Sequence, residues 1–119
     1  MSAENLPILI LVRDLLFSTR IIEAARAAGV QYKVIRQPEA LQFEAGRVLI
    51  VDLNQDGATE AAGAWRNQTG KLAIGFVSHV DTEAIQRAKA AGIDQILSRG
   101  AFTQLLPNLI RGETDRASK

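Results

Sequence analysis

The chain has 119 residues, 47% of them hydrophobic, which is typical of one globular domain rather than a disordered segment. Fourteen basic against 13 acidic residues give a net charge of +1, which supplies no electrostatic argument for a nucleic-acid or membrane-surface partner. Cysteine is absent, which excludes disulfides and thiolate metal sites and favours a cytoplasmic location. The longest apolar run, Leu6 to Val12, is too short to span a bilayer.

The first third of the chain alternates an apolar run with a helical pattern. Leu6 to Val12 predicts a strand, and Leu15 to Ala28 predicts a helix that Gly29 ends. The residues expected on the buried face of this helix are Leu15, Ile22, Ala25 and Ala28. Gln31 to Arg36 predicts a short strand nearer the sheet edge, and Pro38 to Phe43 predicts one or two helical turns at most.

The middle of the chain contains the segment around which the others are arranged. Val48 to Val51 is an unbroken apolar run that ends at Asp52, as expected of a strand buried on both faces of a parallel sheet. The loop from Leu53 to Gly57 contains turn-forming residues. A helix from Thr59 to Asn67 follows, in which Trp65 is either a packing anchor or an interface residue.

The last part of the chain predicts two more strand–helix units. The predicted elements are a strand Leu72 to Val77, a helix Thr82 to Ala91, a short strand Ile96 to Leu97 and a helix Thr103 to about Arg111. Asp81 is expected to cap the first of these helices. A loop from Ser98 to Ala101 precedes the second helix, which Thr103 is expected to cap, and residues 113–119 form a polar tail.

Five strand–helix units predict a single α/β domain with its core at about residues 6–112. The expected architecture is a three-layer, doubly wound, flavodoxin-like (βα)5 fold with a parallel sheet in the order 2-1-3-4-5 and right-handed crossovers. In this fold the loops after four of the strands meet at one edge of the sheet. These loops carry Asp14, Asp52, Ser78 and Arg99.

The segment Phe76 to Phe102, FVSHVDTEAIQRAKAAGIDQILSRGAF, together with IVDLN around Asp52, resembles the response-regulator receiver domain (CheY-like). The similarity covers nearly the whole chain. It implies that Asp52 is a phosphoacceptor candidate and that Asn54 offers a backbone carbonyl to Mg²⁺. It also implies that Ser78 and Arg99 contact the phosphoryl group, in the places of the family's hydroxyl residue and lysine.

The sequence departs from the receiver pattern at several positions. The acidic pair that holds magnesium in the family reads Arg13-Asp14, so the candidate metal set of Asp14, Asp52 and Asn54 is weak. Arg13 could modify the site by pairing with Asp52 or Asp14, so that a permanent internal cation replaces the metal. Gly100 follows Arg99 where the family has proline, which removes the family's cis peptide. These changes are those of an atypical receiver, or pseudo-receiver.

Three functions remain open. The first is a stand-alone, non-enzymatic receiver-like signalling domain that binds a protein partner, or a second copy of itself, through the last strand and flanking helices. Surplus apolar residues on the last helix favour this surface: Leu105, Leu106, Leu109 and Ile110. The second is a working phosphorelay receiver of two-component signal transduction, phosphorylated on Asp52 with Mg²⁺. The third is a flavodoxin-like small-molecule or enzymatic domain using Ser78, His79 and Arg99.

A hydrolase relay of Ser78, His79 and Asp81 is disfavoured. Three residues within one tight turn do not readily point at one another, and the chain has no Gly-X-Ser-X-Gly segment.

Overall fold

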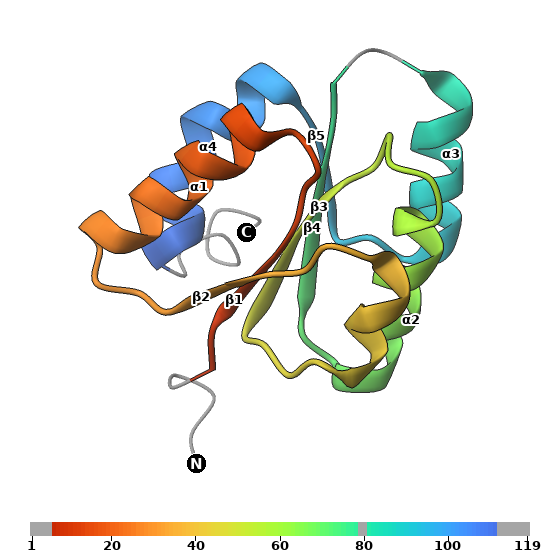
Figure 1. Ribbon diagram of the computed structural model, residues 1–119. Coiled ribbons are helices and arrows are strands. Elements are labelled where there is room, and N and C mark those ends of the chain that lie inside the picture. Colours follow the sequence, from red (N-terminus) through yellow and green to blue (C-terminus); the bar gives the residue numbers. More distant parts are fainter. Residues whose placement is uncertain (1–5, 79–80, 112–119) are drawn as a thin grey trace.

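The structure is a computed structural model that describes residues 6–78 and 81–111. Five parallel strands form one sheet in the order β2-β1-β3-β4-β5 (Figure 1). The strands are β1 (Ile8–Leu11), β2 (Tyr32–Val34), β3 (Val48–Asp52), β4 (Leu72–Val77) and β5 (Gln95–Ser98). The predicted fold class and strand order are therefore confirmed.

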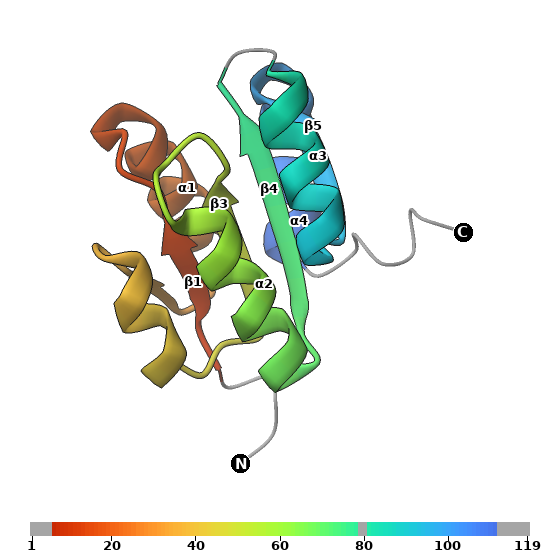
Figure 2. The ribbon, with the colours of Figure 1, turned by 90° about the vertical axis from the view of Figure 1, so that its right-hand side faces the viewer.

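Helices cover both faces of the sheet. They are α1 (Leu15–Ala27), the 3-10 helix η2 (Pro38–Phe43), α2 (Ala58–Thr69), α3 (Thr82–Ala91) and α4 (Arg99–Arg111). Helices α1 and α4 lie on one face, and η2, α2 and α3 lie on the other (Figures 1 and 2). Asp81 caps α3 as predicted, because its carboxylate accepts hydrogen bonds from the backbone N–H groups of Glu83 and Ala84.

The central strands supply both halves of the core. Because successive side chains on a strand point to opposite faces, Ile8 and Ile50 pack under α1 and α4, whereas Leu9 and Leu49 pack under α2 and α3. All residues of β1 and β3 are buried, including Asp52. The segment chosen from sequence as the centre of the sheet therefore holds that place.

The buried face of α1 differs from the predicted one. Leu15 is 70% exposed and Ala28 lies on the surface as the C-cap residue. The face that meets the core carries Phe17, Ile21 and Ala25, spaced four residues apart. Apolar side chains stand on both sides of the first turn, so the periodicity did not decide which of them is buried.

The start of α4 also differs from the prediction. No loop separates β5 from α4, because Ser98 ends the strand and Arg99 is the first helical residue. Ser98 Oγ accepts a hydrogen bond from Ala101 N–H at 3.1 Å, and so acts as the N-cap. Thr103, the predicted cap, instead donates from inside the helix to the carbonyl of Arg99 at 2.9 Å.

The burial of the side chains shows what Trp65 and the apolar residues of the last helix do. Trp65 is 1% exposed, and its indole N–H donates to the Glu44 carbonyl at 3.0 Å, so it is a packing anchor and not an interface residue. Leu106, Leu109 and Ile110 are buried in the core beneath α4. The apolar surplus of the last helix therefore serves packing within the domain and does not form an exposed surface.

Some predicted features lie outside the described residues. They are the chain start at residues 1–5, His79 and the tail at 113–119. In the part of the chain that is described, no helix is long and apolar enough to cross a membrane.

We expect Trp65→Phe to lower the free energy of unfolding by about 2 kcal/mol, because the partly buried Glu44 carbonyl loses its donor and the smaller ring leaves space in the core. Urea unfolding followed by far-UV circular dichroism measures this loss. The control is Phe43→Ala, because Phe43 belongs to the neighbouring η2 but is 82% exposed. The control should change the stability by less than about 0.5 kcal/mol, and equal losses in both variants would contradict this account.

Candidate functional site

The carboxyl ends of β1, β3, β4 and β5 lie along one edge of the sheet. Asp14 follows β1 as the N-cap of α1, and Asp52 is the last residue of β3. Ser78 follows β4, and Arg99 begins α4 directly after β5. All four predicted site residues are therefore at the edge where open α/β sheets bind ligands.

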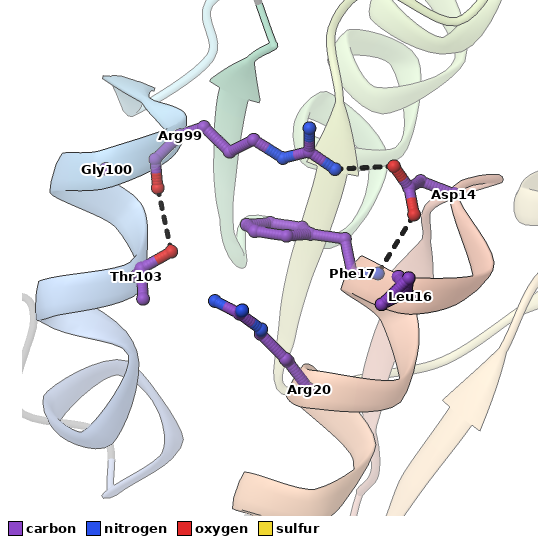
Figure 3. Close-up of a pocket in the computed structure, with 7 residues that line it drawn as sticks. All are labelled: Asp14, Leu16, Phe17, Arg20, Arg99, Gly100 and Thr103. Atoms are coloured by element: carbon purple, nitrogen blue, oxygen red, sulfur yellow. Dashed lines mark hydrogen bonds and ion pairs between the residues drawn. The ribbon is translucent and has the colours of Figure 1, made fainter.

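Asp14 uses both of its carboxylate oxygens within the protein (Figure 3). Oδ1 accepts from the backbone N–H of Phe17 at 3.0 Å, and Oδ2 accepts from the Arg99 guanidinium at 2.5 Å. The hydrogen bond from Phe17, and then that from Arg99, hold the pKa of Asp14 below its ordinary value of 3.8, although burial acts in the opposite direction. The carboxylate is therefore charged at neutral pH.

Arg99 also stacks on an aromatic cluster. Its guanidinium carbon lies 4.5 Å from the centroid of the Phe17 ring, within the range of a cation–π contact (Figure 3). The Phe17 ring lies 4.7 Å from that of Phe76 and 5.5 Å from that of Phe102, centroid to centroid. Through these contacts Arg99 connects the start of α4 to the first turn of α1 and to the core beneath both helices.

The loops after β3 and β4 are joined by Asn54. Its backbone N–H donates to Asp52 Oδ1 at 2.9 Å, and its side-chain oxygen accepts from the backbone N–H of Ser78 at 2.6 Å. The resemblance implied only that the backbone carbonyl of Asn54 would bind Mg²⁺. The link that its side chain makes to Ser78 was not predicted from the sequence. It fixes the distance between two loops that flank Asp52.

Arg13 is not the partner of Asp14. The salt bridge at Asp14 is made by Arg99, and none of the salt bridges between described residues involves Arg13. Arg13 is exposed and lines a pocket of about 440 Å³ beside the end of β2. The cation that pairs with Asp14 is Arg99, which comes from the junction of β5 and α4.

The donor set expected for magnesium does not fit the ion. Mg²⁺ needs several oxygen ligands in near-octahedral geometry. Asp14 is engaged by a helix N–H and a guanidinium, and Asp52 Oδ1 accepts from Asn54. Among residues 6–78 and 81–111, no group of three or more His, Asp or Glu residues could hold a metal ion.

The two residues predicted to contact a phosphoryl group, Ser78 and Arg99, have different partners within the protein. Arg99 is directed at Asp14, and the backbone of Ser78 is directed at Asn54. Within the described residues, no hydrogen bond joins Ser78 to Arg99. The sequence analysis missed the contact between Arg99 and the aromatic cluster. The positions of three phenylalanines could have indicated it, because Phe17, Phe76 and Phe102 all lie close in sequence to strand ends at this edge.

The fold and the edge site together define a doubly wound, flavodoxin-like domain. More narrowly, the fold is that of response-regulator receiver domains. A CheY-like receiver domain protein from Methanospirillum hungatei superposes with a TM-score of 0.77 at 16% identity, covering 92% of this chain and 94% of that one. A two-component response regulator from Clostridium difficile gives 0.76 at 15% identity, covering 96% and 99%.

The BeF3-activated receiver domain of DrrB gives a TM-score of 0.75 at 15% identity, with 92% of this chain and 97% of that chain covered. No family model and no curated protein matches the sequence. At these identities the similarity shows the fold alone.

We expect Asp14→Asn to lower the urea midpoint at neutral pH, because asparagine keeps an oxygen for the Phe17 N–H but loses the charge that attracts Arg99. A carboxyl whose pKa is lowered by folding stabilises the protein above its unfolded pKa, and this stabilisation is lost as pH falls through the folded pKa. The difference between wild type and Asp14→Asn should therefore stay constant from about pH 7 to about pH 5 and shrink as the pH falls below about 4.

The matched control is Asp56→Asn, because Asp56 is exposed and forms no salt bridge with a described residue. Its midpoint should stay close to that of wild type at each pH. A wild-type advantage over Asp14→Asn that is independent of pH would contradict the ion-pair account.

Proposed function

We propose that the chain is a receiver-like signalling domain that binds a protein partner, and that the Asp14–Arg99 ion pair takes the place of the cation and phosphoryl switch. The observation that carries this proposal is the engagement of both Asp14 oxygens inside the protein. The remaining acidic residue of the receiver pattern after β1 is thereby withdrawn from metal binding.

The substitution of Arg99 for the family's lysine supports the proposal on chemical grounds. A guanidinium stays protonated at any physiological pH, and its planar fork suits a carboxylate and an aromatic face at once. Arg99 makes both contacts, one to Asp14 and one to Phe17. In this proposal the junction of β5 and α4 is held in one arrangement without a phosphoryl group.

The proposed partner surface is the edge formed by β5 with α3 and α4. Among the described strands, β5 pairs with β4 alone and is the last strand of the sheet. Its residues Ile96 and Leu97 are only partly buried, unlike those of β1 and β3. A non-enzymatic role and a cytoplasmic location remain predictions from the sequence.

Phosphorylation of Asp52 is the second candidate function. It is favoured by the position of Asp52 at the carboxyl end of the central strand and by the resemblance of IVDLN to the segment that carries the acceptor in receivers. The missing metal set counts against it. The third reading, a small-molecule site at Ser78, His79 and Arg99, receives no support from Arg99, which is already paired.

We expect no phosphoryl adduct on the wild-type protein after incubation with acetyl phosphate and millimolar Mg²⁺, because its metal ligands are incomplete. Intact-protein mass spectrometry measures the adduct. The double variant Arg13→Asp/Arg99→Lys restores the acidic pair and the lysine of the receiver pattern and removes the guanidinium fork from Asp14, so it should gain Mg²⁺ binding in calorimetric titration. A stoichiometric wild-type adduct that is lost in Asp52→Asn would overturn the proposal.

A photo-cross-linking amino acid placed at Gln95 on β5 is expected to capture a specific protein in the native host cells, because this position lies on the proposed partner edge. The control places the same amino acid at Lys33, an exposed position on the opposite edge strand β2. Gel shifts with mass spectrometry identify the products. The same products from Lys33 as from Gln95, or none from Gln95, would count against the assigned surface.

A further inference from the structure

A second pocket, of about 440 Å³, lies at the carboxyl ends of β1, β2 and β3. Its polar lining comes from three separate loops: Arg13 after β1, Arg36 and Gln37 after β2, and Gln55 and Asp56 after β3. The groove between α1 and α4 in Figure 3 is lined by other residues, including Asp14, Arg20 and Arg99. The volume falls within the range of small-molecule sites, which is about 300–1,000 Å³.

The charge of this pocket favours an anion. Arg13 and Arg36 supply two positive charges and Asp56 one negative charge, so the lining carries a net charge of +1. No salt bridge or side-chain hydrogen bond between described residues engages either guanidinium. Two guanidinium forks on opposite loops can together bind the three oxygens of a phosphomonoester.

Gln55 adds an unsatisfied acceptor. Its side-chain Oε1 is buried and has no hydrogen-bond partner among the described residues. Its backbone is satisfied, because its N–H donates to the Asp52 carbonyl at 3.2 Å and its carbonyl accepts from Ala58 N–H at 3.1 Å. A buried acceptor without a donor is costly to the fold, and each such atom needs an explanation, such as a bound water, an ion or a ligand.

The position in the sheet is that of a ligand site. Strands β1 and β3 lie side by side, and the helices that follow them, α1 and α2, cover opposite faces. At such a switch point the two loops diverge and leave a crevice outside the strand ends, which is where open α/β sheets bind ligands. Arg13 and Gln55 belong to those two diverging loops.

We propose that this pocket binds a small phosphomonoester that carries free hydroxyl groups. The phosphoryl group lies between Arg13 and Arg36. Gln55 Oε1 has almost no accessible surface in this structure, so the Gln55 side chain must rotate toward the pocket for Oε1 to accept a hydrogen bond from a ligand hydroxyl. A small molecule rather than a phosphorylated protein segment is favoured by the lining from three loops and by the pocket volume, since protein interfaces are broader surfaces. This site does not depend on whether Asp52 is phosphorylated.

Titration of the ¹⁵N-labelled protein tests the site with four probes: ribose 5-phosphate, inorganic phosphate, ribose and a phosphoserine hexapeptide. We expect ribose 5-phosphate to bind at least about tenfold more tightly than inorganic phosphate, because only the sugar phosphate can satisfy Gln55. Ribose alone should cause no saturable shift. The largest amide shifts should occur at Arg13, Arg36 and Gln55.

Substitutions in the pocket test the contacts to the phosphate and to the sugar hydroxyl separately. Arg36→Gln should weaken both inorganic phosphate and ribose 5-phosphate by about tenfold, the loss expected for a charge-assisted hydrogen bond. Gln55→Leu should leave phosphate binding unchanged and abolish the advantage of the sugar phosphate. Arg20→Gln is the matched control, because Arg20 is also an exposed arginine but lines the other groove.

Several results would overturn the proposal. They are the absence of saturable shifts with ribose 5-phosphate, equal weakening by Arg20→Gln and Arg36→Gln, and an unchanged sugar-phosphate advantage in Gln55→Leu. Tighter binding of the phosphoserine peptide would overturn the small-molecule assignment. If Gln55→Leu does not fold, Gln55→Glu replaces it and should weaken both phosphates by tenfold or more, because it adds a negative charge to the pocket.

Discussion

The ion pair between Asp14 and Arg99 is the contact on which the functional edge depends. Both side chains are partly exposed, so the Coulomb energy of the pair is modest. Its importance lies in how firmly each partner is already placed. Asp14 is held by the helix N–H that it caps, and Arg99 by the Phe17 ring and by its position at the start of α4. Because both partners are already placed, the pair forms at little cost in side-chain entropy and joins the first turn of α1 to the start of α4.

Much of the fold could be predicted from sequence because its three central strands, β1, β3 and β4, are almost entirely apolar runs. Two helical details could not. The first turn of α1 offers apolar side chains on both faces, and the choice of Phe17 over Leu15 is made by Phe76 and Phe102, which are distant in sequence. Thr103 was the predicted cap of α4, but Ser98 takes that role, and the helix that begins at Arg99 carries Phe102 into the core.

The candidate site, like the fold, could be predicted only in part from the sequence. The topology was sufficient to bring four predicted residues to one edge, but not to pair them. Arg13 and Arg99 are equivalent in charge, and only the positions of their backbones decide that Arg99 faces Asp14 while Arg13 faces the end of β2. The edge consequently has two different regions: a corner at α1 and α4, where Arg99 is paired with Asp14, and a pocket near β2, where neither arginine forms a salt bridge with a described residue.

Ser98 is at once the last residue of β5 and the cap of α4, so no spare residue lies between strand and helix. A helix turns by about 100° per residue. One residue inserted at this junction would rotate Arg99 away from Asp14 and carry Phe102 and Leu106 out of the core together. The number of residues at the junction of β5 and α4 thus sets how α4 is rotated about its own axis. A deletion or insertion there changes the direction in which every side chain of the helix points.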